Sequence, residues 1–236
     1  ATNRLTGFQN TGSTCALLDA DDDGDLDLFV GWGGSGPQGL NVYTNNGAGS
    51  FSLIWDPLPL LPLVSEGSSD CLVIDFNNDG LDDLLVVSGI AGDNGTPIKM
   101  QVLVSQGDGS FVDETLERIP DQAFSWLPNR VESYDVNGDG HLDLIASSGR
   151  DMPLYTNNGT GHFIRLPAGF INTPFSVFDR VTATDMNNDG RTDFAITYLL
   201  DGNPDEPPAR YNIAIGVDQG AVHTGDGNAN GLLGDS

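Results

Sequence analysis

The chain has 236 residues, of which 38% are hydrophobic, and this is enough for one large domain or a repeat array with a packed core. Its formal net charge of −25 argues against nucleic acid as a partner, because the phosphates would be repelled. No apolar run is long enough to span a membrane, and no basic segment followed by an apolar one opens the chain, so we expect a mature or trimmed N-terminus.

One acidic motif occurs four times and organises the chain. It places Asp or Asn oxygens at positions 1, 3, 5 and 9 and glycine at position 6. Its first aspartate recurs at residues 19, 75, 135 and 185, at intervals of 56, 60 and 50 residues. The oxygen-bearing side chains are Asp19, Asp21, Asp23 and Asp27; Asp75, Asn77, Asp79 and Asp83; Asp135, Asn137, Asp139 and Asp143; and Asp185, Asn187, Asp189 and Asp193.

Short β-prone runs flank every copy of the motif. The runs before the motifs are 15–18, 71–74, 131–134 and 181–184. The runs after the motifs are 28–30, 84–87, 144–146 and 194–197. Short apolar runs bounded by turn residues are typical of strands. Each motif is therefore predicted to be a loop between two antiparallel strands.

A second marker, rich in Asn and Gly, follows later in the units. It covers residues 43–51 and 155–163, with a shorter form at 106–111 and a degenerate one at 218–220. Asn-Gly and Gly-x-Gly supply the positive φ angles of a hairpin turn, so each unit holds about four strands, the content of one propeller blade. We predict an all-β fold, a β-propeller or propeller segment over residues 1–236, with four-stranded antiparallel blades at about 14–56, 70–115, 130–166 and 180–222.

Three further segments interrupt or end this pattern. Residues 222–236 begin like a fifth unit, but Gly234 replaces the ninth-position aspartate, so this segment is either a weak site at Asp226 or a tail. The proline-rich connection 53–64 is expected to pack on the adjacent blade; alternatively it is an exposed interface for another subunit. Residues 201–208 are predicted to form a solvated loop.

The chemistry of the motif favours calcium. Ca²⁺ takes six to eight oxygen ligands in a flexible shell, whereas Mg²⁺ takes fewer protein ligands and Zn²⁺ prefers His or Cys. Position 7 would contribute its main-chain carbonyl, at Asp25, Leu81, His141 and Arg191. An EF-hand is excluded because its position 12 requires Glu, and here that position holds Val30, Val86, Ala146 and Ile196. A tandem nonapeptide calcium roll is excluded by the longer period.

The acidic motif followed by the turn Asn-Asn-Gly-x-Gly-x-Phe resembles the FG-GAP/VCBS repeats. These are the calcium blades of integrin α-subunit propellers, many secreted bacterial proteins and some fungal lectins. The resemblance extends over about residues 14–222. It implies a structural calcium loop between the first two strands of each blade, and hence about four Ca²⁺ ions. Such propellers usually have about seven blades, so a ring of four or five blades, a truncated array and completion by another subunit all stay open.

The remaining reactive side chains give no catalytic pattern. His141, His162 and His223 are scattered over loops and the tail, so we predict that the chain is not an enzyme. Cys15 and Cys71 occupy equivalent positions in successive units; we expect buried free thiols, with a disulfide as the alternative. The tryptophans either fill gaps between blades or stack on sugars or protein, and they are Trp32, Trp55 and Trp126.

We therefore predict a secreted, calcium-stabilised propeller at the cell exterior or surface, acting as a binding or adhesion module for carbohydrate or an extracellular protein. Calcium sites of this kind stay filled outside the cell, where Ca²⁺ is abundant. One alternative is a self-assembling structural subunit of an extracellular filament. Another is a non-catalytic domain of a polysaccharide-active enzyme. Asn94 and Asn158 match the acceptor pattern for N-glycosylation.

Overall fold

The structure is a computed structural model that describes residues 12–32, 40–54, 68–88, 100–122, 128, 130–147, 152–167, 177–185, 192–199, 210–218 and 221–222. Several sequence predictions lie outside these residues. They concern Asn94, Trp55, Trp126, His223 and Asp226, most of segment 53–64, segment 201–208, and Asn187, Asp189 and Arg191 of the fourth motif. Trp32 ends a strand, but its side chain also lies outside the description.

Four antiparallel sheets of four consecutive strands make up the described fold, which confirms the all-β prediction of four-stranded units. The first blade contains β1 (Gly12–Leu18), β2 (Asp27–Trp32), β3 (Asn41–Asn45) and β4 (Phe51–Leu53). The second contains β5 (Ser68–Ile74), β6 (Asp83–Ser88), β7 (Met100–Ser105) and β8 (Phe111–Asp113). The third contains β9 (Arg130–Tyr134), β10 (Asp143–Ser147), β11 (Leu154–Asn157) and β12 (Phe163–Arg165). The fourth contains β13 (Val177–Thr184), β14 (Asp193–Leu199), β15 (Arg210–Asp218) and β16 (Ala221–Val222).

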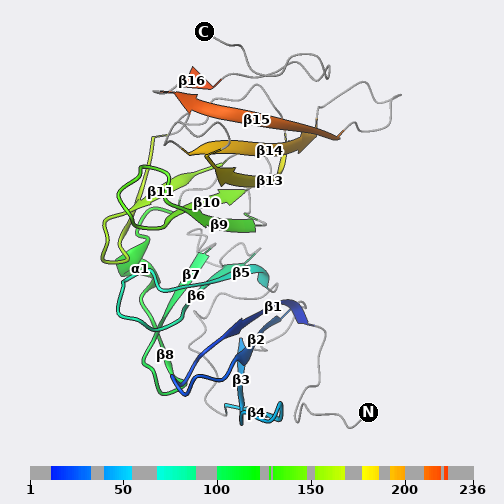
Figure 1. The fold of residues 1–236 in the computed structure, drawn as a ribbon, viewed down its shortest axis with the longest axis vertical. Coiled ribbons are helices and arrows are strands. Elements are labelled where there is room, and N and C mark those ends of the chain that lie inside the picture. Colours follow the sequence, from blue (N-terminus) through cyan, green and yellow to red (C-terminus); the bar gives the residue numbers. More distant parts are fainter. Residues whose placement is uncertain are drawn as a thin grey trace, which may run out of the picture.

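The blades follow one another along the long axis of the molecule, with the first and fourth at opposite ends (Figure 1). Their first strands lie side by side, because β5 contacts both β1 and β9, and β9 contacts β13. Each acidic motif connects the first and second strands of its blade. The motifs therefore all leave the array at the same end of the first strands.

Apolar clusters fill the spaces between successive blades. Side chains alternate between the two faces of a strand, and a blade inside the array is covered on both faces. Leu84 and Val86 of β6 pack toward the first blade, whereas Leu85 and Val87 pack toward the third. All four are at most 1% exposed, so this strand is a continuous apolar run instead of an alternating one. A third cluster joins the third and fourth blades through residues such as Ile145, Phe194 and Ile196.

A short helix and an exposed cysteine differ from the sequence predictions. The helix α1 (Thr115–Arg118) follows the second blade, and Asp113 accepts the main-chain N–H of Thr115 at 3.0 Å at its start. Cys15 and Cys71 are free, as expected, but Cys15 is exposed and Cys71 is only partly buried, so the prediction of a buried thiol was wrong for Cys15. Its side chain lies on the face of β1 opposite to Ala16 and Leu18, which pack toward the second blade.

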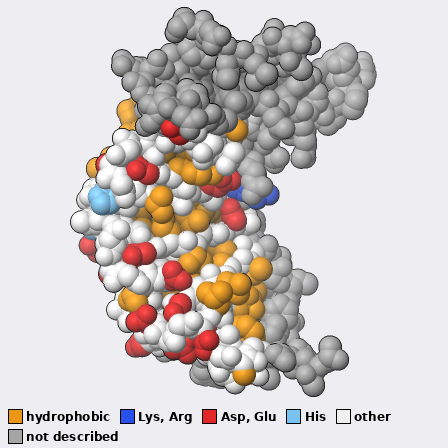
Figure 2. Space-filling model, viewed as in Figure 1, with side chains coloured by type: hydrophobic (Ala, Val, Ile, Leu, Met, Phe, Trp, Pro, Cys, Tyr) orange, Lys and Arg blue, Asp and Glu red, His pale blue; other side chains and the backbone are white. Residues whose placement is uncertain are grey.

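Among the charged side chains on the described surface, acidic ones outnumber basic ones. Figure 2 shows them spread over the described part of one face, where basic side chains are sparse. No helix in the described ranges is long and apolar enough to cross a membrane.

Candidate metal loops between the blades

The first aspartate of the motif folds its loop through the main chain. We number the loops in chain order, as 19–27, 75–83, 135–143 and 185–193. In each of the first three, one carboxylate oxygen of position 1 accepts the N–H of position 5 and the other accepts the N–H of position 6, at 2.9 to 3.1 Å. The glycine at position 6 has φ between +87° and +90°, a conformation that costs other residues strain, which explains its presence.

Positions 3 and 5 are linked in a second layer of hydrogen bonds. The carboxylate of position 5 accepts the N–H of position 7 at 2.9 Å in each of the first three loops. In the second and third loops, Asn77 and Asn137 accept the N–H of position 5 and donate their side-chain amide to its carboxylate, each at 2.9 Å. The main chain of the loop is thus wrapped around side-chain oxygens.

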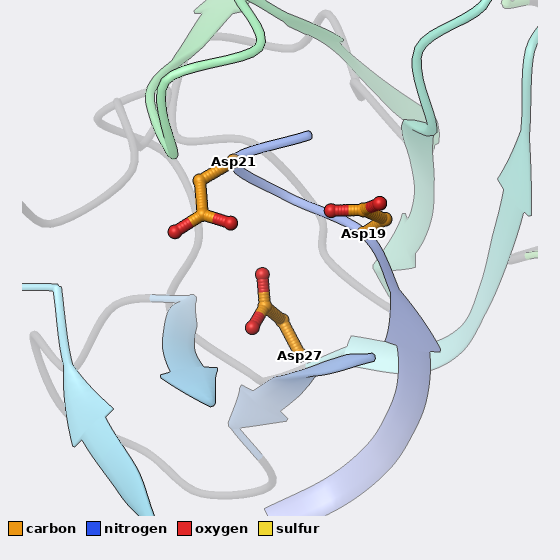
Figure 3. Close-up of side chains that lie close together, drawn as sticks. All are labelled: Asp19, Asp21 and Asp27. Carbon is orange, nitrogen blue, oxygen red and sulfur yellow. The ribbon is translucent and has the colours of Figure 1, made fainter. Parts of the chain in front are cut away.

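The first loop differs because position 3 is a carboxylate. Asp21 cannot donate a proton as asparagine does, and its Oδ1 is buried without a hydrogen-bond partner among the described residues. Asp19, Asp21 and Asp27 each offer an oxygen within 4.8 Å of the others, with Asp21 and Asp27 pointing toward each other (Figure 3). Burial raises the pKa of Asp21, and the charges of Asp27, Asp23 and Asp19 raise it further.

The aspartate at position 9 ties the loop to the third strand of its own blade. Asp143 is fully buried; its Oδ2 accepts the N–H of Val136 at 3.0 Å, and its Oδ1 accepts the N–H of Asn157 at 2.7 Å. Asp27 makes the same pair of bonds, to Ala20 at 2.9 Å and to Asn45 at 2.7 Å. This side chain therefore has a structural role that does not depend on a metal.

Asp83 is the position-9 residue whose charge is least compensated. It is fully buried, and its Oδ1 accepts the N–H of Ser105 at 2.9 Å. Its Oδ2 has no hydrogen-bond partner among the described residues. Burial raises the pKa of Asp83 from 3.8 to about 7, and the charges of Asp79 and Asp75 add to this effect, while the main-chain N–H groups of Ser105 and Phe76 oppose it.

These features fit a hard divalent cation. The donors are carboxylate and amide oxygens, and two of the buried oxygens, on Asp21 and Asp83, lack a proton donor in the described structure. Buried carboxylates close to like charges are unfavourable unless a positive charge offsets them. Oxygen donors of this kind suit Ca²⁺ rather than Zn²⁺.

Position 7 has a side-chain contact that sequence reasoning missed. Because a different residue stands at position 7 in each loop, the sequence suggested that only the main-chain carbonyl of this position is used, as a metal ligand. However, a Cβ added to Gly159 in the hairpin turn would lie 2.6 Å from Nε2 of His141, so the imidazole packs directly on the glycine. Asp25 packs in the same way on Gly47, and Leu81 packs on Gly107. The Gly-rich turn therefore leaves room for the acidic loop of its own blade.

The loops also contact the following blade, which the sequence did not indicate. Gly109, in the turn of the second blade, donates its N–H to Ala20 O of the first loop at 3.0 Å. Asn157 of the third blade donates its amide to Phe76 O of the second loop at 3.0 Å. Asn78 of the second loop donates to Gly159 O at 3.2 Å.

Side chains at position 8 and in α1 make further contacts between successive blades. Asp82 of the second loop accepts the N–H of Asp19 at 2.9 Å, and Thr192 of the fourth donates to Asp135 O at 2.9 Å. Arg118 of α1 lies 5.3 Å from the ring centre of Phe76 and donates to Thr160 O at 2.7 Å. Each of the first three loops thus forms part of the junction with the next blade. In the sequence, only a polar residue at position 8 of the following motif could have indicated these contacts between blades.

Repeated four-stranded antiparallel sheets joined through Asp-rich loops define a blade-repeat protein of the propeller type. The model of the FG-GAP-like repeat matches residues 19–86, 75–146 and 135–196. The chain belongs to this family of repeats.

Solved structures with a similar arrangement come from several sources. One is an Agrocybe aegerita lectin described as recognising non-reducing terminal N-acetylglucosamine, with 18% identity, a TM-score of 0.48, and coverage of 82% of this chain and 50% of the lectin. Another is the V. cholerae biofilm matrix protein Bap1, with 16% identity, a TM-score of 0.43, and coverage of 84% of this chain and 26% of Bap1. The chain thus spans half or less of either protein. No curated protein sequence matches it.

Proposed function

We propose that this chain is a secreted, calcium-stabilised β-propeller module that binds carbohydrate or an extracellular protein. The observation that carries the proposal is the shared construction of the first three acidic loops. They gather carboxylates, leave buried oxygens of Asp21 and Asp83 without a proton donor in the described structure, and contact the next blade. A cation in such a loop would strengthen the blade and its junction at once.

The residues that would hold calcium are those at positions 1, 3, 5 and 9, together with the carbonyl of position 7. Bound Ca²⁺ would supply the positive charge that offsets the neighbouring carboxylates. The protein contributes the rest: the position-1 aspartate orients the turn, and the position-9 aspartate fixes the loop to the third strand. By sequence, the fourth loop repeats this donor set, which gives about four ions per chain.

The proposed dependence on calcium also favours a location outside the cell. Loops that depend on Ca²⁺ for stability stay filled where the ion is abundant. The acidic surface seen in Figure 2 would also keep copies of the chain apart in solution.

A binding role is favoured over catalysis by the way the acid and base groups are used. Among the described residues, the most enzyme-like grouping is Thr160, His162 and Glu117, with 3.1 Å from Thr160 Oγ1 to His162 Nδ1 and 3.7 Å from His162 Nε2 to Glu117 Oε1. Thr160 donates its proton to Asn158 at 2.7 Å instead, and the side chains of His162 and Glu117 are 41% and 69% exposed. The hydroxyl is therefore not activated as a nucleophile.

A second candidate function, assembly into an extracellular structure, has one observation in its favour. Leu17 is 56% exposed and Leu26 is 55% exposed in the first blade, at the end of the array. An additional blade, from the same or another chain, would cover Leu17, because its counterpart Val73 in the second blade packs against the cluster shared with the first blade.

A printed glycan array probed with the labelled chain tests the proposed binding function. We expect signals in Ca²⁺ that disappear in EDTA, because the scaffold that holds the binding loops would loosen. Identical signals in Ca²⁺ and EDTA would contradict the calcium-dependent scaffold. Sedimentation velocity on the same sample tests the assembly function, which predicts species larger than a monomer.

A further inference from the structure

The first strands of the second, third and fourth blades line an open cavity that the metal loops do not use. It has a volume of about 410 Å³ and is lined by Asp70 of β5, by Arg130, Val131 and Glu132 of β9, and by Thr182 of β13. Asp70 precedes its metal loop by five residues of extended chain, or about 16 Å. The size falls within the range of roughly 300–1,000 Å³ typical of small-molecule sites. We call this space the axial cavity.

Arg130 is the notable group in the axial cavity. The chain has 9 basic and 34 acidic side chains, yet the half-buried side chain of Arg130 forms no hydrogen bond or ion pair with any described residue. A guanidinium carries five N–H donors in a fixed plane and stays charged at all relevant pH values. Because the guanidinium has no partner among the described residues and is only half-buried, its donors can bind water or a ligand.

The acceptors of the axial cavity are held in place by the strands. Asp70 Oδ2 accepts the N–H of Val131 at 3.0 Å, which fixes the carboxylate across the junction between the second and third blades. Glu132 accepts the hydroxyl proton of Tyr134, and that hydroxyl lies 3.1 Å from Thr182 Oγ1. A chain of hydrogen bonds therefore links β9 to β13. The site is prearranged instead of being formed by mobile side chains.

The combination of groups selects the class of ligand. Two carboxylates disfavour an anion, and the guanidinium disfavours a cation. A neutral molecule with several hydroxyl groups satisfies both, since each hydroxyl can donate to Asp70 or Glu132 and accept from Arg130 or Thr182. We infer that the axial cavity binds a neutral mono- or disaccharide, an inference that rests on the proposed binding function.

Calorimetric titration of the full chain in calcium-containing buffer tests this inference. The probes are glucose, galactose, mannose, N-acetylglucosamine and their disaccharides, with glucuronate and glucosamine as anionic and cationic counterparts. Arg130→Gln should weaken binding of the preferred neutral sugar at least about tenfold, and so should Asp70→Asn, which keeps an acceptor for Val131. Arg165→Gln is the control, because it removes the same charge from β12, where Arg165 faces Asp121 at 4.0 Å.

Each outcome decides between the inference and the wider function. Weaker binding in Arg130→Gln and unchanged binding in Arg165→Gln, with unchanged melting temperatures, would support the axial cavity as the sugar site. If a sugar binds Arg130→Gln as it binds the original chain, the inference is wrong while the binding function stands. Tighter binding of a charged counterpart than of any neutral sugar would overturn the ligand class. If no probe binds, the inference fails, and the glycan array then decides the binding function separately.

Discussion

Replacing Asp83 by asparagine should change stability in opposite directions with and without calcium. Asp83 is fully buried, and one of its oxygens has no hydrogen-bond partner among the described residues. Its pKa is raised to about 7 because burial disfavours the charged form. Asparagine keeps an oxygen to accept the N–H of Ser105 and removes the charge.

The size of the effect follows from the shift in pKa. A raised pKa means that the folded state holds the proton more tightly than the unfolded state, so the stabilisation is complete below pH 3.8 and is lost as the pH rises through about 7. A shift of about 3 units corresponds to about 4 kcal/mol. In EDTA at pH 8.5, the Asp83→Asn variant should therefore exceed the original chain in stability by up to about 4 kcal/mol, or roughly 10 °C in melting temperature. At pH 5 the difference should shrink.

In calcium, the original chain should instead be more stable than the Asp83→Asn variant. The original chain offers a charged ligand at position 9 and the variant does not, so added Ca²⁺ should raise the melting temperature of the original chain by more. Differential scanning calorimetry at both pH values, in Ca²⁺ and in EDTA, measures all four differences. Asp22→Asn is the matched control: Asp22 is exposed at position 4 of the first loop, with φ of 56°, a conformation that asparagine tolerates. If Asp83→Asn destabilises the chain equally in Ca²⁺ and EDTA, the buried carboxylate of Asp83 is not a calcium ligand and the reasoning is wrong.

Two further predictions concern the turns and the thiols. Gly159→Ala should destabilise the chain by at least about 1 kcal/mol more than Gly138→Ala in urea unfolding. Both glycines have positive φ, but the new methyl group collides with His141 only in the first case, so equal losses would contradict the packing described for position 7. Iodoacetamide should alkylate Cys15 several times faster than Cys71, because Cys15 is exposed and burial raises the pKa of the Cys71 thiol. Equal rates by peptide mass spectrometry would contradict this assignment.

The sequence predicted the local features of this fold because they are encoded by neighbouring residues. Gly140 at position 6 and the oxygen at Asp135 are five residues apart, and the structure joins them in one turn. The apolar runs beside each motif are strands because their residues pack between blades. The acidic motif and the apolar runs beside it recur in every unit, so comparing the units within this one sequence was enough to find them.

The junctions between blades were not predictable in the same way. Asn157 donates to Phe76 O across 81 residues, and Asp82 accepts from Asp19 across 63. Such pairs depend on how two sheets are set against each other, which no local pattern specifies. The exposure of Cys15 has the same origin, because it depends on which face of the first blade is covered. Helix α1 has only four residues, too few for a periodic signal.

The calcium dependence of stability tests the central claim most directly. Calorimetric melting of the full chain should show a clearly higher melting temperature in Ca²⁺ than in EDTA, since each site at a hundredfold excess over its Kd contributes about 2.7 kcal/mol. Titration with Ca²⁺ should saturate at about four ions per chain, one for each loop of the repeated motif. Identical melting curves in Ca²⁺ and EDTA would contradict the account of these loops as metal-held junctions between blades.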